Sequence, residues 1–135
     1  MRLGWGYCPP DITDVLHRLR EPFNVSVPAQ EAGIAAVEDG EFLALAQTHN
    51  GYWLPWMTEQ LRALGIDVPA SVCNFILARF GSKDRADAAD RHLRSVGIIV
   101  RKMGGYGLPE SLRITIGRDD ENRALVSALT DFVRG

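Results

Sequence analysis

Residues 98–116 read IIVRKMGGYGLPESLRITI, two short runs rich in apolar residues on either side of a glycine-rich loop. Both runs fit extended strands, and the loop at 104–109 has the glycine and proline residues typical of a turn between neighbouring strands. The stretch therefore predicts a hairpin-like pair of strands, the first at 98–103 and the second at 112–116.

The spacing of apolar residues in the rest of the chain predicts five helices and two further strands. In chain order, the expected elements are a strand at 3–8, helices at 12–19, 28–39 and 42–64, a strand at 72–78, a helix ending at Gly97, the two strands of the hairpin, and a helix capped by Asp119 or Asp120. This order indicates an α+β fold in which helices pack on a small, largely antiparallel sheet.

The first of these strands has no obvious partner in the chain. It is short and rich in aromatic residues, and it stops at Pro9-Pro10. An unpaired strand leaves its backbone groups available to another sheet. The strand at 3–8 therefore suggests that part of a larger sheet comes from elsewhere.

The composition is that of an ordinary folded domain: 135 residues, 46% apolar and 24% charged, with a net charge of -2. This balance excludes disorder as a default and gives no bulk positive charge to attract nucleic acid or an anionic membrane. No stretch approaches the roughly 18 uninterrupted apolar residues of a membrane span, and residues 1–20 lack the pattern of a signal peptide. We expect a cytoplasmic protein with neither nucleic acid nor membrane as a partner.

Residues that form disulfides or bind metals are few and scattered. Cys8 and Cys73 lie far apart without a suitable ligand nearby, which indicates two reduced, buried thiols rather than a nucleophile. His17, His49 and His92 have no second ligand at a suitable spacing, so we expect them at helix surfaces or boundaries. The sequence predicts no metal site.

Two arginines on the predicted hairpin could bind an anion. Leu112 and Ile114 share one face of their strand, so Arg113 points to the other face. Arg101 lies on the predicted neighbouring strand and could bind an anion in the same way. A planar guanidinium fits a carboxylate or a phosphate through two hydrogen bonds. The simpler interpretation pairs Arg113 with a nearby Asp or Glu. Both arginines facing one pocket would instead form a strong anion site.

Two other motifs favour structural interpretations. The glycine loop at 104–107 has neither the ending of a phosphate-binding loop nor the spacing of a dinucleotide-binding one, so it is interpreted as a turn. The cluster of Tyr52, Trp53 and Trp56 has no interleaved basic residues, which favours packing over stacking on bases.

Four segments, in matching order and spacing, together resemble the histidinol-phosphate aminotransferase family. They are RLGWG at 2–6, REPFNVS at 20–26, SVCNFIL at 71–77 and GYGLPESLRITIG at 105–117. The family depends on pyridoxal phosphate and has the aspartate-aminotransferase fold. Only its C-terminal part is matched, which implies that residues 1–10 are a remnant strand of the missing large domain and that 11–135 form the C-terminal small domain.

The resemblance implies that Arg2 contacts the phosphate of pyridoxal phosphate. In the family, the strand beginning with this arginine follows a Ser-Lys-x-x-Gly segment whose lysine forms the Schiff base with the cofactor. Here that lysine would lie upstream of Met1, and neither Lys83 nor Lys102 has its context. The expectation is a truncated chain that has no catalytic residue, lacks the cofactor's covalent anchor and is inactive by itself.

The resemblance also implies two residues that bind the substrate. Arg113 corresponds to the family's C-terminal arginine for the substrate anion, and Arg101 to the arginine that binds the substrate phosphate. The implied reaction transfers an amino group between glutamate and imidazole-acetol phosphate in histidine biosynthesis, carried out by a homodimer.

Two alternatives stay open at this point. Aromatic amino-acid aminotransferases and threonine-phosphate decarboxylases share much of this pattern, and Arg101 favours a phosphorylated substrate without choosing between the phosphate-specific enzymes. In a different class, the chain could be a noncatalytic interaction module that pairs through its orphan strand and its apolar faces.

Overall fold

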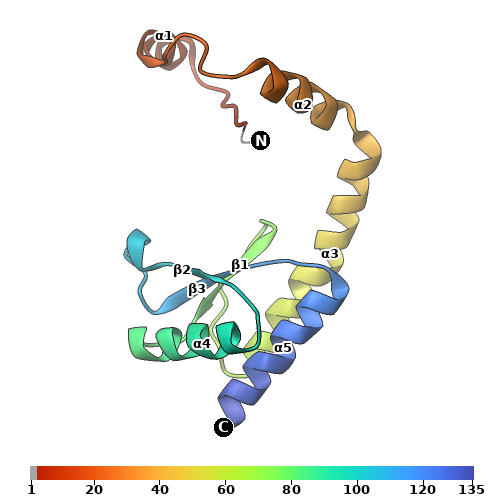
Figure 1. Ribbon diagram of the computed structural model, residues 1–135, viewed down its shortest axis with the longest axis vertical. Helices are drawn as coiled ribbons and strands as arrows, with labels where there is room; N and C mark the ends of the chain where they lie inside the picture. Colours follow the sequence, from red (N-terminus) through yellow and green to blue (C-terminus); the bar gives the residue numbers. More distant parts are fainter. Residues whose placement is uncertain (1–2) are drawn as a thin grey trace. The chain divides into compact units, whose positions relative to one another are not determined.

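The computed structural model describes residues 3–135, and its helices and strands are drawn in Figure 1. In chain order they are α1 (Pro10–Leu19), α2 (Val27–Glu38), α3 (Gly40–Ala63), β1 (Phe75–Arg79), α4 (Lys83–Ser95), β2 (Arg101–Lys102), the short 3₁₀ helix η1 (Gly104–Tyr106), β3 (Ser111–Thr115) and α5 (Asp119–Arg134). The chain divides into two compact units, Met1–Leu45 and Ala46–Gly135, and α3 crosses the boundary. The predicted α+β class is confirmed.

The sheet lies in the second unit and has three antiparallel strands in the order β1-β3-β2 (Figure 1). The central strand, β3, pairs along its whole length with β1 but at only two positions with β2. The hairpin predicted from the sequence is therefore present, although its first strand covers Arg101–Lys102 rather than 98–103. The expected strand at 72–78 is also shifted, since β1 begins at Phe75.

One face of the sheet carries the core. Ile76 and Ala78 of β1 point to this face together with Leu112 and Ile114 of β3, and each is at most 1% exposed. They form a single apolar cluster with residues from α3, α4 and α5, among them Met57, Leu61, Ala86, Ala89, Leu93, Leu125, Ala128 and Leu129. The predicted alternation along β3 is confirmed, because Arg113 lies between two core residues and points to the opposite face.

The ends of α4 follow ordinary capping rules. The hydroxyl of Ser82 accepts a hydrogen bond of 3.2 Å from the backbone N–H of Arg85, which satisfies one of the free donors of the first turn. Past the other end, Gly97 has a φ of 82°, the left-handed conformation that glycine adopts without strain. The helix therefore stops where the sequence predicted.

The start of α5 differs from the prediction. Asp119 and Asp120 do not cap the helix but lie in its first turn, and the preceding residue is Arg118. The backbone N–H of Arg118 donates a hydrogen bond of 2.8 Å to the Glu121 carboxylate. Three acidic side chains in the first turn suit the positive end of the helix dipole, so they stabilise this start from within the helix.

The described residues of the first unit bury very little. Of residues 3–45, only Ala29 is buried, and the apolar side chains of α1 at Ile12, Val15, Leu16 and Leu19 are all exposed. Residues 3–9 form no regular secondary structure. The strand predicted at 3–8 is not formed within the described residues, because a strand needs a partner and no described segment pairs with it. That these residues join a sheet of another domain stays a prediction.

Cys8 and Cys73 are both free, as expected, but they are not both buried. Cys73 is exposed because it precedes β1 instead of lying within it, and Cys8 is half-buried. Among residues 3–135, no group of three or more His, Cys, Asp and Glu side chains could hold a metal ion. None of the helices in this part of the chain is long and apolar enough to cross a membrane.

Candidate functional site

Arg101 and Arg113 lie directly opposite each other on β2 and β3. Residues paired in this way have Cα atoms about 4.5–5.5 Å apart and present their side chains on the same face of the sheet. Two like charges at such a position repel each other and destabilise the pair unless something neutralises them. The structure therefore brings together the two arginines that the sequence singled out.

The pairing between β2 and β3 stops at these arginines. A continued antiparallel register would place Val100 opposite Ile114, but residues 98–100 are not paired with β3. As a result, a gap opens at the edge of the sheet between residues 98–100 and the end of β3.

A pocket of about 560 Å³ occupies this gap. It is bounded by residues from the segment before β2, from β3 and the turn after it, from α3 and from the first turns of α5. These residues are Met57, Gly97, Ile98, Ile99, Val100, Arg101, Arg113, Ile114, Thr115, Gly117, Glu121, Asn122, Ala124 and Leu125. The lining is mostly apolar and its charged residues are Arg101, Arg113 and Glu121, so the two arginines give it a net positive charge that suits a small ligand with an anionic group.

Arg113 has no counter-ion within the described part of the chain. It is half-buried, it makes no ion pair with a described Asp or Glu, and its Nε is buried without a hydrogen-bond partner. Its guanidinium carbon lies 5.0 Å from the centre of the Phe75 ring. The simpler interpretation, an arginine paired with a nearby carboxylate, does not hold for residues 3–135. An unneutralised, half-buried cation favours binding of an external anion.

Arg101 is exposed and is held by a residue of the glycine loop. Its Nη2 donates a hydrogen bond of 2.8 Å to the hydroxyl of Tyr106, and its guanidinium carbon lies 5.3 Å from the centre of the Tyr106 ring. The loop is a tight turn, as predicted: the Leu108 N–H bonds to the Met103 carbonyl, and Gly107 has a φ of 76°. It therefore contributes to the site through a side chain rather than by cradling a ligand with its backbone.

The strand that carries Arg101 is tied to α4 by an ion-pair cluster. Lys102 of β2 and Lys83 of α4 both pair with Asp87 of α4. Hydrogen bonds from the Lys102 and Lys83 ammonium groups lower the pKa of Asp87 from 3.8 to about 2, and Asp87 raises the pKa of Lys83 in turn. The cluster holds the short edge strand in place at the position next to Arg101.

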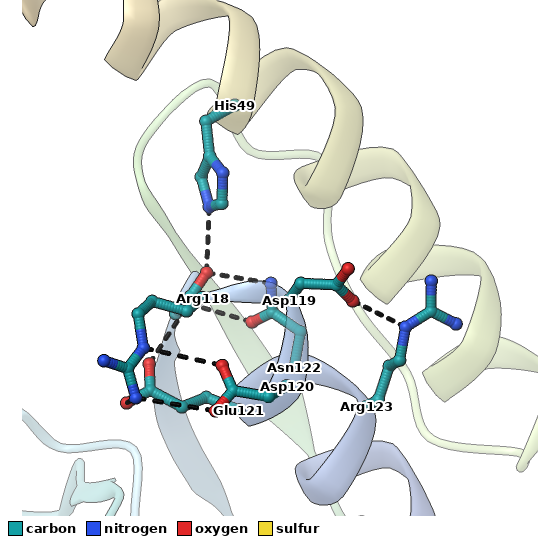
Figure 2. Close-up of polar contacts among 8 residues, drawn as sticks. His49, Arg118, Asp119, Asp120, Glu121, Asn122 and Arg123 are labelled. Atoms are coloured by element: carbon teal, nitrogen blue, oxygen red, sulfur yellow. Dashed lines mark hydrogen bonds and ion pairs between the residues drawn. The ribbon is translucent and has the colours of Figure 1, made fainter.

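The turn that follows β3 is clamped by side chains from two helices (Figure 2). Asn122 of α5 accepts a hydrogen bond of 2.8 Å from the N–H of Gly117 and donates one of 2.9 Å to its carbonyl. The Nε2 of His49 from α3 lies 2.9 Å from the same carbonyl oxygen. A carbonyl only accepts hydrogen bonds, so His49 carries a proton on Nε2. The clamp fixes the end of the strand that presents Arg113.

Gly117 leaves no room for a side chain. A Cβ atom at this position would lie 2.8 Å from the Glu121 carboxylate and 3.1 Å from the Glu121 Cβ. The absence of a side chain thus permits the close approach of the turn to α5. Sequence reasoning gave no role to Asn122 and interpreted His49 as a helix-surface or boundary residue. Asn122 reaches Gly117 from five residues along the chain, whereas His49 contacts it only because the fold brings α3 to this turn.

The described residues supply no lysine suited to a Schiff base with pyridoxal phosphate. Lys83 and Lys102 are the only lysines of the sequence, and both are engaged by Asp87. Asp87 raises the pKa of Lys83 and so favours its charged ammonium form, whereas a Schiff base forms from the neutral amine. Arg2, the expected contact to the cofactor phosphate, lies outside the described residues. The cofactor would therefore need residues other than those described.

The two tryptophans of the aromatic cluster of α3 pack as the sequence predicted, whereas Tyr52 is 60% exposed. Trp53 is 6% exposed and meets the rings of Tyr52 and Trp56 edge to face, at centroid distances of 5.1 and 5.0 Å. The guanidinium of Arg123 from α5 lies over both tryptophans, 5.2 and 5.5 Å from their ring centres. These contacts join α3 to α5 on the side that also carries the clamp on Gly117.

Known proteins that resemble this chain are aminotransferases. The family model "Aminotransferase class I and II" matches residues 1–129. The histidinol-phosphate aminotransferase of Paramagnetospirillum magneticum is 57% identical over 98% of the chain, and that of Rhodospirillum centenum is 50% identical over 100% of it. The chain spans only 37% and 38% of the length of these two relatives.

The fold agrees with that of a solved relative. The crystal structure of histidinol-phosphate aminotransferase from Sinorhizobium meliloti, in complex with pyridoxal-5'-phosphate, superposes with a TM-score of 0.78 at 24% sequence identity. The match covers 93% of this chain and 34% of that one. Because a family model and close relatives both match nearly its whole length, the chain belongs to the class I and II aminotransferases.

Proposed function

We propose that this chain is the substrate-binding C-terminal part of an aminotransferase that transfers an amino group between glutamate and imidazole-acetol phosphate. Two unneutralised arginines that face each other beside a pocket are the observation that carries this proposal. The relatives named histidinol-phosphate aminotransferase support the choice of substrate.

Arg113 and Arg101 would act as the anion-binding pair. The half-buried guanidinium of Arg113 has donors available for a phosphate or a carboxylate, and Arg101 adds a second cation on the same face of the sheet. A phosphate carries more charge than a carboxylate and can accept from both arginines at once. The pair therefore suits the phosphate of histidinol phosphate, and a carboxylate of glutamate can use the same donors in the other half-reaction.

Pyridoxal phosphate would supply the electron sink on which amino-group transfer depends. By family resemblance, Arg2 would contact its phosphate. Lys83 and Lys102 do not fit the role of the Schiff-base lysine, because both pair with Asp87. We therefore expect no transaminase activity from these 135 residues alone, and a homodimeric, cytoplasmic enzyme when the rest of an aminotransferase is joined to them.

A chimera tests the proposal. In the Paramagnetospirillum magneticum enzyme, the C-terminal part that this chain matches, 37% of the protein, is replaced by the chain itself. The chimera should convert histidinol phosphate and 2-oxoglutarate into imidazole-acetol phosphate and glutamate. Turnover of phenylalanine in preference to histidinol phosphate would instead identify an aromatic aminotransferase.

Two variants of the chimera test whether Arg113 binds the substrate. Arg113→Met should reduce kcat/KM for histidinol phosphate by about tenfold to 150-fold, the range expected for loss of hydrogen bonds to a charged group. Arg62→Met provides the control, because Arg62 binds the Val68 carbonyl and does not line the pocket. A folded chimera without activity, or equal losses in both variants, would contradict the proposal.

A further inference from the structure

Tyr106 is an exposed side chain with a specific contact that the proposed function does not yet use. It lies in the turn between β2 and β3, and 62% of its surface is exposed. Its hydroxyl accepts the hydrogen bond from Arg101, and its ring lies under the same guanidinium. One residue therefore contacts Arg101 both through a hydrogen bond and through an aromatic face.

Arg101 lines the pocket from an exposed position. It lies on an edge strand with only two paired residues, and it faces the positive charge of Arg113. An exposed arginine on such a strand has many rotamers, and repulsion from a cation favours those that point away. Ordering a flexible side chain on binding weakens affinity, so a guanidinium already held in place binds an anion more tightly.

The turn gives Tyr106 a fixed position from which to hold the guanidinium. The Tyr106 N–H donates a hydrogen bond of 2.9 Å to the Met103 carbonyl, and the Gly107 N–H donates one of 3.1 Å to the Gly104 carbonyl. The contact with the Tyr106 hydroxyl uses one N–H of the guanidinium, which has five. Several donors of Arg101 therefore stay available for an anion.

We propose that Tyr106 is a positioning residue that holds Arg101 beside Arg113, so that the two guanidinium groups bind a phosphate together. The inference rests on the proposed anion site at these two arginines. Tyr106 acts through Arg101 and does not itself need to touch the ligand. Its effect should therefore disappear when Arg101 is absent.

A double-mutant cycle on the 135-residue chain tests this dependence. Inorganic phosphate is titrated against the wild type, Tyr106→Phe, Arg101→Met and the double variant, and the dissociation constant is measured by ³¹P NMR. Tyr106→Phe keeps the ring but loses the hydroxyl, and we expect phosphate to bind about threefold to tenfold more weakly. In the Arg101→Met background the same change should have no effect.

The outcomes separate this inference from the proposed site. If Arg101→Met weakens phosphate binding but Tyr106→Phe does not, the anion site stands and the role of Tyr106 is wrong. If Tyr106→Phe weakens binding equally with and without Arg101, the tyrosine acts through the loop and the inference is again wrong. If the wild type shows no saturable binding, or if neither Arg101→Met nor Arg113→Met alters it, the anion site fails and the inference fails with it.

Discussion

The two units of the chain differ in how they use their apolar residues. In the second unit, the sheet and three helices enclose a continuous core whose central side chains are fully buried. In the first unit, α1 and α2 have apolar residues at helical spacing, yet almost all of these side chains are exposed. Helical periodicity alone therefore does not guarantee a core, since an amphipathic helix also needs a surface to pack against.

This difference bears on function, because the candidate site lies entirely in the second unit. Its arginines are presented by the sheet, and the turn next to them is clamped by buried polar contacts. A site built on strands and helices with a core behind them keeps its geometry better than one built on loosely packed segments. The stability of the second unit should therefore decide whether the anion site forms.

The largest contrast between the units should appear when leucines are truncated. Leu112→Ala should lower the free energy of unfolding by about 2–5 kcal/mol, because the side chain is completely buried in the core. Leu19→Ala in α1 should change it by at most about 0.5 kcal/mol, because Leu19 is 74% exposed. Urea denaturation measures both. Equal losses would show that α1 is packed as tightly as the sheet.

Adding a methyl group to a glycine tests the tightness of the clamped turn. Gly117→Ala should cost about 1–3 kcal/mol, because the new Cβ would lie 2.8 Å from the Glu121 carboxylate and 3.1 Å from its Cβ. Gly51→Ala is the matched control: no atom lies within 4 Å of its added Cβ in α3, so alanine should stabilise the chain by about 0.4–1 kcal/mol. Two changes of the same sign and size would mean that Gly117 is not tightly packed.

Removing His49 should have a smaller effect on the same turn. His49→Ala deletes one of the two donors to the Gly117 carbonyl, while Asn122 still provides the other. We expect a loss of about 0.5–1.5 kcal/mol in the free energy of unfolding. His49→Gln retains an N–H donor and should recover part of the loss, as measured by thermal denaturation. Equal stabilities of the alanine and glutamine variants would show that the hydrogen bond from His49 does not stabilise the turn.

The smallest effect concerns pH and the anchoring of β2. The folded-state pKa of Asp87 is about 2, below the ordinary value of 3.8, because Lys102 and Lys83 donate to its carboxylate. Its contribution is therefore complete above about pH 4 and is lost as the pH falls toward 2. Urea midpoints between pH 5 and pH 2 should fall less steeply in Asp87→Asn than in the wild type. Asp131→Asn, at an exposed carboxylate on α5, should follow the wild type.

Much of the second unit could be predicted from residue spacing. The alternation of Leu112, Arg113 and Ile114 correctly separated the core face from the arginine face, and Gly97 correctly marked a helix end. Such patterns are local, so a sequence expresses them directly. The strand predicted at 3–8 is not formed here, because strand formation depends on a partner, which no local pattern supplies.

The site could be predicted only in part. Arg101 and Arg113 were predicted correctly on neighbouring strands, but β2 is shorter than the predicted strand because residues 98–100 do not pair with β3. His49 was not linked to Gly117, since the two residues are 68 positions apart and meet only through tertiary packing. Asn122 was not linked to Gly117 although the two are only five positions apart, since their contact depends on the conformation of the turn before α5. The contact between Arg101 and Tyr106 likewise depends on the conformation of the turn.

The most direct test of the central claim is to observe which arginines respond to the substrate. Histidinol phosphate is titrated into the ¹⁵N-labelled chain, and the Nε–Hε signals of its 13 arginines are followed by NMR. We expect saturable shifts at Arg101 and Arg113, and loss of binding in Arg113→Met. Saturable shifts confined to other arginines, or binding that survives Arg113→Met unchanged, would contradict this expectation.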